Sequence, residues 1–377
     1  MKPKDFGIAK AQKPIFLIGE AQGENEKKIG KGFVGTTGAE LLRMLNDAGV
    51  IELTSEDRSY LSKFYRTKDP WTLAAIWDLH PELYRTNVFQ QHPPGNDLLY
   101  FCGGKSEGIP GYPILQKSKY VRKEFQHELD RLGDEILIHD PNLIVCLGNS
   151  ALWAMGGRTG ITKLRGTTCV STHTVSGYKL LLTYHPSAVT RQWELRPTTV
   201  ADLSKILKEK DTSNVTRPKC EVWIDPSLEE IQRFITEHVL GCELLSVDIE
   251  TSGNQITRIG FAPRRDLAIV IPIHDTRTNT GSYWKTKEDE RCCWELIRSI
   301  LEASEIPKLF QNGLYDIPFI LRTVGIAIRG AAHDTMLLHH ALQPESLKGL
   351  AYLGSIYTDH HAWKTEYRNS RTIKRDA

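Results

Sequence analysis

The feature that most constrains this sequence is a short apolar segment that carries two acidic residues on one face. Leu244–Ile249 is an apolar run of the length typical of a buried β-strand. Successive side chains point to opposite faces of a strand, so Asp248 and Glu250 share one face. Two adjacent carboxylates repel each other and lose hydration, and a divalent cation is the usual compensation. An edge strand with a solvated acidic end explains the pair equally well at this point.

The residues that follow favour a metal site. Lys308–Phe310 predicts a short strand, which delivers Asn312 and Asp316 to the start of a helix. Three ordered motifs resemble those of the proofreading 3′–5′ exonuclease domain of bacterial polymerase I: Asp248-x-Glu250, Gln311-Asn312-x-x-Tyr315-Asp316 and Asp334-Thr335-Met336-Leu337. This resemblance covers roughly Lys219–Leu353, and it implies an RNase H-like mixed sheet and a two-metal nuclease.

The exonuclease resemblance also implies a role for each motif residue. Such a domain uses Mg²⁺ or Mn²⁺, and Asp248 and Asp316 match its metal ligands. Glu250 would bind metal and position the attacking water, and Asn312 would orient the terminal nucleotide. Asp334 precedes a predicted helix, which implies that it caps the helix rather than binding metal.

The last metal ligand of this family lies near the C-terminus of its domain, four residues after a tyrosine. Asp376 stands in that neighbourhood, with Thr372 where the tyrosine is expected. The fourth ligand is therefore Asp376 or is absent. We expect the domain to stop at its third motif.

Polar residues follow several predicted strands in the first half of the chain. The strands are predicted at Pro14–Gly19, Leu83–Val88, Leu143–Leu147 and Lys179–Thr183. If the sheet is parallel, their carboxyl ends meet at one edge, which is where open α/β sheets bind ligands. The residues at these ends are Glu20, Asn87, Gly148 and His185.

Phe33 and Asn87 each have both a functional and a structural interpretation. Phe33 lies between glycines, where it can stack on a base or pack into the core, and both are common. The amide of Asn87 can pair with a base edge, or the residue can simply form a turn. The loop after the first strand lacks a following Gly-Lys-Ser/Thr, so nucleoside triphosphate binding is not expected.

Five ordered motifs across Pro14–Lys208 resemble the uracil-DNA glycosylase superfamily, closest to its iron–sulfur group. They are Gly19-Glu20-Ala21-x-Gly23-x-x-Glu26, Gly32-Phe33-Val34-Gly35, Thr86-Asn87-Val88 with Pro93-Pro94-Gly95-Asn96, Ile161-Thr162-Lys163-Leu164-Arg165-Gly166 and Tyr184-His185-Pro186-Ser187. The resemblance implies a parallel-sheet α/β/α domain that acts on a uracil flipped out of the DNA stack.

The glycosylase resemblance implies two catalytic residues. Glu20 would assist the oxocarbenium-like sugar or orient water, and His185 would donate to the oxygen of the departing base. The uracil would lie in a pocket formed by Gln22, Gly23, Phe33 and Asn87. The residues expected to contact DNA are Lys163, Arg165, Ser187 and Arg191.

The cysteines of this chain do not follow the pattern of the iron–sulfur group. No cysteine precedes Pro14, and Gln91 stands where the motif carries one. Cys102 alone cannot hold a cluster, so we expect no iron–sulfur centre. Gln22 also replaces the proline of the first motif.

Length and composition set broad limits. With 377 residues, two domains are expected: a glycosylase-like domain at 1–210, a linker at 211–218 and an exonuclease-like domain at 219–377. A net charge of +2 gives no global basic field, so DNA contacts must come from local patches. The seven cysteines show no disulfide framework, which favours a reducing cytoplasm, of the host if the chain is viral. We expect no signal peptide and no membrane span.

The sequence therefore predicts an α/β protein that binds uracil-containing DNA, single- or double-stranded. The first hypothesis is a uracil-excising glycosylase joined to a metal-dependent exonuclease. The alternative is a non-catalytic, uracil-sensing front end of a family A DNA polymerase, whose polymerase domain or subunit would be a partner.

Overall fold

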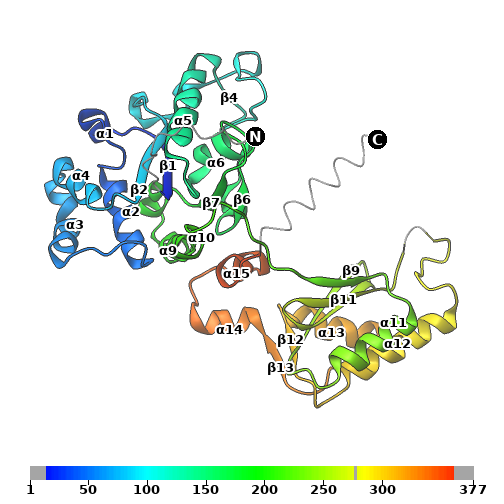
Figure 1. The fold of residues 1–377 in the computed structure, drawn as a ribbon. Coiled ribbons are helices and arrows are strands. Elements are labelled where there is room, and N and C mark those ends of the chain that lie inside the picture. Colours follow the sequence, from blue (N-terminus) through cyan, green and yellow to red (C-terminus); the bar gives the residue numbers. More distant parts are fainter. Residues whose placement is uncertain (1–13, 276–277, 361–377) are drawn as a thin grey trace. The chain divides into compact units, whose positions relative to one another are not determined.

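The computed structural model describes residues 14–275 and 278–360 (Figure 1). These residues form two compact units, one made of 14–217 with 354–360 and the other of 218–353. The first unit thus combines two segments that are separated in the sequence by the whole of the second unit. Among the described residues, no helix is both long and apolar enough to cross a membrane.

The first unit is built on a five-stranded sheet. Its strands, in spatial order, are β2 (Leu83–Phe89), β1 (Ile15–Ala21), β5 (Leu143–Leu147), β7 (Lys179–Thr183) and β6 (Thr168–Val170). Neighbouring strands from β2 to β7 are parallel, and only the edge strand β6 is antiparallel. The predicted parallel sheet is confirmed, so the carboxyl ends of four strands share one edge.

Helices cover both faces of this sheet. In β1, Phe16 and Ile18 belong to one core cluster, whereas Ile15 and Leu17 belong to the other. A strand buried on both faces requires a helical layer on each side, which gives the predicted α/β/α sandwich. One layer contains α5 (Gln126–His139) and α6 (Gly148–Gly156); the other contains α2 (Thr36–Asp47), α3 (Ser55–Thr67), α4 (Pro70–Asp78), α9 (Arg196–Ser204) and α10 (Ile206–Glu209).

Short elements complete the first unit. Three helices lie next to the carboxyl edge of the sheet: α1 (Glu24–Ile29), α7 (Ile161–Leu164) and α8 (Pro186–Arg191). A separate two-stranded antiparallel sheet consists of β3 (Cys102–Gly103) and β4 (Tyr120–Val121). The remaining turns are 3₁₀-helices at Pro94–Asn96, Leu98–Phe101, Lys105–Glu107, Lys123–Phe125 and Trp193–Leu195.

The second unit contains a six-stranded mixed sheet. Its order is β13 (Ala332–Asp334), β12 (Lys308–Phe310), β9 (Leu245–Ser252), β10 (Gln255–Arg264), β11 (Leu267–Pro272) and β8 (Glu221–Ile224). The central strands β9, β10 and β11 are antiparallel, and the outer pairings are parallel. The predicted mixed sheet is confirmed.

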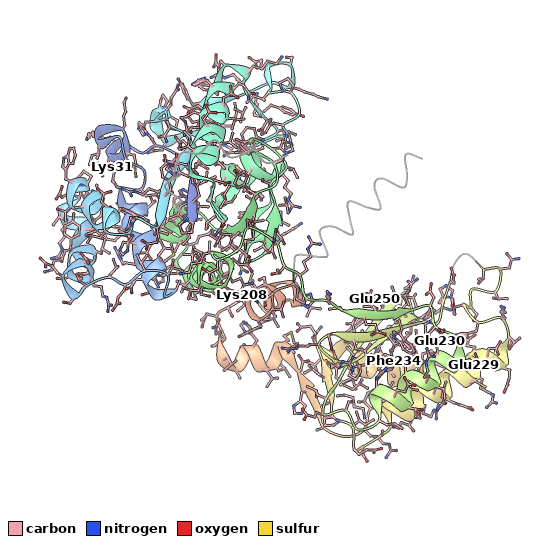
Figure 2. The ribbon with its side chains drawn as sticks, in the orientation of Figure 1. Lys31, Lys208, Glu229, Glu230, Phe234 and Glu250 are labelled. Atoms are coloured by element: carbon pink, nitrogen blue, oxygen red, sulfur yellow. The ribbon has the colours of Figure 1, made fainter. Side chains whose placement is uncertain are left out.

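The helices of the second unit are α11 (Leu228–Phe234), α12 (Lys287–Leu301), α13 (Gly313–Val324) and α14 (Thr335–Leu342). The last described helix, α15 (Leu350–Tyr357), begins in the second unit, and its residues from 354 onward belong to the first. A π-helical turn, Ile235–Val239, extends α11. In β9, Val247 and Ile249 are buried in the core, whereas Asp248 and Glu250 are exposed. The predicted alternation is therefore confirmed, and Figure 2 shows Glu250 on this strand.

Candidate active sites

The carboxyl edge of the first sheet brings four predicted glycosylase residues together. Asn87 pairs in register with Gly19, the neighbour of Glu20. A Cβ atom added to Gly19 would lie 2.3 Å from Asn87 Oδ1 and 2.6 Å from Phe33 Cζ. The rings of Phe33 and His185 are 6.3 Å apart between centroids. Gly19 is therefore the residue that lets an amide and an aromatic ring approach the strand end.

Glu20 is held in place by a hydroxyl group. Ser150 Oγ, from the first turn of α6, donates to Glu20 Oε2 at 2.7 Å. The start of α6 can approach this closely because Gly148 adopts a φ of 87°, and a Cβ there would lie 2.9 Å from His185 Cβ. The Glu20 carboxylate and the His185 imidazole thus lie close to the two junctions at which β5 leads into α6 and β7 leads into α8.

The hydrogen bonds of His185 define which of its nitrogens can act as a donor. The backbone N–H of Ser187 donates to His185 Nδ1 at 3.2 Å, and Ser187 Oγ lies 2.7 Å from the same nitrogen. Nδ1 is therefore an acceptor, and in the neutral ring the proton resides on Nε2. Burial lowers the pKa of His185; Glu20 opposes this shift and Arg191 adds to it. The neutral ring with a free Nε2–H donor is favoured at neutral pH.

Phe33 is buried and its backbone is held from both sides. It is 4 % exposed and has a φ of 57°, a left-handed conformation that costs a residue with a Cβ roughly 1–3 kcal/mol. Glu26 Oε1 accepts the N–H groups of Val34 and Gly35 at 3.1 Å each, and Trp77 Nε1 donates to the Phe33 carbonyl at 2.9 Å. Hydrogen bonds to a charged group contribute about 1.5–3 kcal/mol each, which is enough to offset the strain.

The remaining pocket residues lie on the loop after β1. The Gln22 side chain donates to Gln90 Oε1, and His92 Nδ1 lies 2.9 Å from the Gln22 carbonyl. A Cβ at Gly23 would lie 2.4 Å from Glu26 Oε2, so only glycine leaves room for that buried carboxylate. The loop is thus tied to the segment that follows β2.

Asn87 is buried, and its backbone carbonyl accepts from Arg131 at 2.8 Å. Among the residues that the structure describes, none hydrogen-bonds its side-chain amide. This amide therefore keeps its donors and its acceptor available at the pocket.

The predicted DNA-contacting residues divide into accessible and buried positions. Lys163 on α7 and Arg191 at the end of α8 are exposed, and Ser187 contacts His185. Arg165 is only 3 % exposed, so the prediction that it binds DNA is wrong. Its guanidinium forms a fork–fork pair with Asp202, with Nε 2.7 Å from Oδ2.

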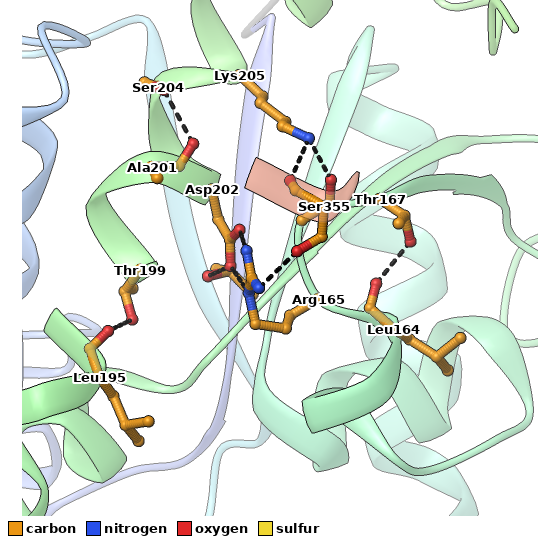
Figure 3. A network of polar contacts seen from close by, with 12 residues as sticks. Leu164, Arg165, Thr167, Leu195, Thr199, Ala201, Asp202, Ser204, Lys205 and Ser355 are labelled. Carbon is orange, nitrogen blue, oxygen red and sulfur yellow. Dashed lines mark hydrogen bonds and ion pairs between the residues drawn. The ribbon is translucent and has the colours of Figure 1, made fainter. Parts of the chain in front are cut away.

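The contacts of Arg165 extend into a larger buried network (Figure 3). Arg165 Nη1 donates to Ser355 Oγ at 2.7 Å, and Thr183 Oγ1 donates to Asp202 at 2.8 Å. Lys205 Nζ donates to the carbonyls of Gly166 and Ser355, at 2.7 Å each. A buried guanidinium with this many internal partners is not available to DNA, and removing it would leave the Asp202 carboxylate buried without this partner.

The predicted acidic residues of the second unit gather beside β9. Asp316, in the first turn of α13, is buried, and its Oδ1 accepts the backbone N–H of Ile249 at 3.2 Å. Ile249 separates Asp248 from Glu250, so the buried carboxylate lies against the strand that carries both exposed ones. Burial raises the pKa of Asp316, and the charges of Asp334 and Glu250 raise it further.

Asp334 is the residue that shapes the start of α13. It caps α14 by accepting the N–H groups of Met336 and Leu337, as predicted. It also accepts the N–H groups of Asn312 and Gly313, at 3.1 and 2.7 Å. Asn312 is exposed at the N-cap with a φ of 65°. Asp334 therefore fixes the helix that delivers Asp316.

The acidic group fits a divalent cation by its chemistry, because carboxylate oxygens are the ligands that Mg²⁺ and Mn²⁺ prefer. Burial is the main cause of the raised pKa of Asp316, and the nearby charges of Asp334 and Glu250 add to it. Within the described ranges 14–275 and 278–360, no three His, Cys, Asp or Glu side chains converge closely enough to form a ready-made metal site. Asp376, the proposed fourth ligand, lies outside the described residues.

Comparison with known protein families matches one family model to each half of the chain. Residues 6–209, more than half of the chain, match the family model described as the uracil DNA glycosylase superfamily. The chain belongs to this superfamily. Residues 227–375 match the model of the 3′–5′ exonuclease family. Both resemblances expected from the sequence motifs are confirmed.

Individual relatives of this glycosylase-superfamily chain are distant. A DNA polymerase of Bacillus phage SP01 is 24% identical over 278 residues, which cover 65% of this chain and 28% of that polymerase. A type-4 uracil-DNA glycosylase of Thermotoga maritima is 27% identical over 195 residues, 51% of this chain and 74% of that enzyme. The chain thus spans little more than a quarter of the phage polymerase. Among solved structures, Brucella melitensis NrnC bound to pGG is similar, with 16% identity, a TM-score of 0.28 and coverage of 38% of this chain and 63% of NrnC.

The cysteines of the glycosylase-superfamily domain do not fit an iron–sulfur cluster. Residues 1–210 contain three cysteines, Cys102, Cys146 and Cys169, whereas an iron–sulfur cluster is held by four. Cys146 is fully buried in β5, and Cys169 lies in β6. The absence of a cluster stays a prediction that rests on this donor set.

Three functional contacts were not recognised from the sequence. Ser150 carries no motif signal, although its place at the start of a helix after a buried strand is a usual one for a group that faces a ligand. Glu26 lies within the first motif without a role assigned from sequence, and Trp77 belongs to none of the motifs. The partners of Ser150 and Trp77 lie 130 and 44 residues away in the sequence, and those of Glu26 lie eight and nine residues away across a loop, so the contacts became visible only in the fold.

Proposed function

We propose that the first unit releases uracil from DNA by hydrolysing the N-glycosidic bond. The observation that carries the proposal is the convergence of Glu20, Phe33, Asn87 and His185 at one sheet edge, in a chain of the uracil DNA glycosylase superfamily. Such a site receives a base only after the nucleotide leaves the helical stack.

Each side chain would contribute one interaction to the reaction. The free amide of Asn87 matches the donor and acceptor groups of a pyrimidine edge. Phe33 offers a ring face held by Glu26 and Trp77. His185 Nε2–H would stabilise negative charge on the departing base, and Glu20, held by Ser150, would stabilise the cationic sugar or orient water.

The test is incubation of the full chain with a uracil-containing oligonucleotide. We expect abasic product from the native chain and a large loss in Glu20→Gln. Glu56→Gln, an exposed position on α3, is the matched control and is expected to retain activity. Tight uracil-DNA binding without any base release would reject hydrolysis and support the non-catalytic alternative.

We further propose that the second unit removes nucleotides from DNA 3′ ends with Mg²⁺ or Mn²⁺. Asp248, Glu250 and Asp316 would hold the cation, which when bound supplies Lewis-acid stabilisation of the phosphoryl oxygens. Asn312, exposed at the helix start that Asp334 fixes, would contact the terminal nucleotide.

Digestion of a 5′-labelled single strand tests this second proposal. Shortening from the 3′ end is expected with the native chain and not with Asp248→Asn combined with Asp316→Asn. Asp266→Asn, exposed beside β11, is the control. An intact substrate with the native chain in both metals would reject the proposal.

A further inference from the structure

A basic segment of the first unit begins directly after β3, forms a loop and continues through β4. Residues 104–123, here called the basic loop, contain five basic residues and one acidic residue, Glu107. The chain as a whole carries a net charge of only +2, so this segment is a strong local concentration of positive charge. The basic residues are Lys105, Lys117, Lys119, Arg122 and Lys123.

Three lysines of the basic loop form no ion pair with any described residue. Arg122 pairs with Glu124 at 2.9 Å, and Lys123 Nζ donates to the Ser106 carbonyl at 3.3 Å. Lys105, Lys117 and Lys119 are exposed, and none has a carboxylate within ion-pair distance among the described residues. Exposed lysines without an internal partner are the groups that can neutralise phosphates.

The base of the loop is fixed to both sides of the glycosylase pocket. On one side, Phe101, directly before β3, stacks on Phe89 with a centroid distance of 4.0 Å, and Phe89 lies two residues after Asn87 in β2. On the other side, the Pro113 carbonyl accepts from Trp153 Nε1 at 2.9 Å.

Trp153 connects this second anchor to the catalytic carboxylate. It lies three residues after Ser150 on α6, so the two side chains are neighbours on one helix face. Ser150 in turn holds Glu20. Electrostatics agree with this proximity: burial raises the pKa of Cys102 in β3, Arg122 and Lys119 lower it, and Glu20 raises it.

The tip of the basic loop has an unusual conformation. Lys117 and Ser118 have φ values of 45° and 58°, and the Lys119 N–H donates to the Gln116 carbonyl at 2.8 Å. This is the geometry of a type I′ turn, which normally uses Asn-Gly because a Cβ is unfavourable at both central positions. The chain places Lys and Ser there, which is a local strain of the kind found at functional sites.

From these observations we propose that the basic loop binds the phosphate backbone of the DNA strand next to the flipped nucleotide, through Lys105, Lys117 and Lys119. Its anchors place it beside the pocket, and its unpaired charges match a polyanion. The inference rests on the proposed glycosylase function for its meaning, although phosphate binding can be measured without catalysis.

The experiment measures the salt dependence of binding of the full chain to a uracil-free, fluorescein-labelled single strand, by anisotropy in EDTA. Each lost phosphate contact lowers the slope of log K against log salt by about 0.7 on single strands. We expect Lys117→Gln with Lys119→Gln to lower the slope by about 1.4. The control is Lys63→Gln with Arg66→Gln, two exposed cations on α3, and its slope is expected to equal that of the native chain.

A second measurement connects the loop to the pocket. On a uracil-containing strand, the loop variant is expected to raise KM and leave kcat unchanged, because its contacts act on the unreacted strand as much as on the transition state. An unchanged salt slope, an equal loss in the control variant, or a lower kcat at constant KM would each overturn the proposal. If the native chain releases no uracil, the glycosylase proposal fails while the salt slopes still decide phosphate binding.

Discussion

The two candidate sites of this protein use acidic side chains in opposite ways. In the first unit, Glu20 is held by Ser150 and faces an imidazole whose pKa is lowered by burial. In the second unit, the pKa of Asp316 is raised by burial and by the charges of Asp334 and Glu250. The first site is thus organised by hydrogen bonds within the protein, whereas the second gathers carboxylate side chains, which are the ligands that a divalent cation prefers. The comparison teaches that only the second site should depend on metal.

Metal removal gives the largest expected difference between the sites. Because a bound metal contributes several kcal/mol to phosphoryl transfer, EDTA is expected to reduce 3′-end degradation about a thousandfold or more. Uracil release, measured in the same samples, is expected to continue at the native rate. Loss of both activities in EDTA, with both restored by Mg²⁺, would remove the distinction between the sites.

The buried contacts of Arg165 in the first unit are tested by comparing its substitution with that of the nearby, exposed Lys163. Arg165→Ala leaves the Asp202 carboxylate buried and unpaired, so we expect the free energy of unfolding to fall by about 3–5 kcal/mol. Lys163→Ala, two residues away and exposed, is expected to leave stability unchanged and to weaken DNA binding. Chemical denaturation measures the first effect and anisotropy the second. Equal stability of the two variants would show that the network in Figure 3 contributes little.

His185→Ala sharpens the comparison from the side of the first site. Removing a preorganised donor to a developing negative charge is expected to lower kcat for uracil release by about 10²–10³-fold. Nuclease activity in the same preparation serves as the internal control and should not change.

The pH dependence of the native chain tests the same histidine. Uracil release should slow as the pH drops below the lowered pKa of His185, since the neutral ring is the donor in the site. A rate that rises on acidification would instead require the imidazolium.

The smallest effect concerns the stability of the second unit. The pKa of Asp316 in the folded protein lies above its ordinary value of 3.8. The free energy of unfolding that the protonated carboxyl contributes is therefore fully present below pH 3.8 and is lost as the pH rises through the folded-state pKa. A cation that neutralises the ionised group should restore stability at neutral pH, by about 2.7 kcal/mol at a hundredfold excess over Kd. Thermal unfolding with MgCl₂ or EDTA measures the shift. The same shift in Asp316→Asn would place the bound cation elsewhere.

Much of the fold was predictable because its signals are local. The bounds predicted for Leu143–Leu147 and Lys179–Thr183 agree with β5 and β7, as expected for short, uniformly apolar runs. The alternation that places Asp248 and Glu250 on one face also follows from strand geometry alone. Arg165 could not be assigned correctly in this way, because its partners lie 37 and 190 residues away in the sequence.

The sequence by itself determined which strands form and which polar residues end them, since apolar runs and terminal motifs are properties of adjacent residues. Only the tertiary structure decided which charges are available for function. It buried Arg165 against Asp202 and left Lys117 and Lys119 exposed. It also placed the N–H groups of Val34 and Gly35 against the Glu26 carboxylate, and the Ser150 hydroxyl against the Glu20 carboxylate. The physical reason is that desolvation and pairing depend on the segments packed around a side chain, and these come from distant parts of the chain.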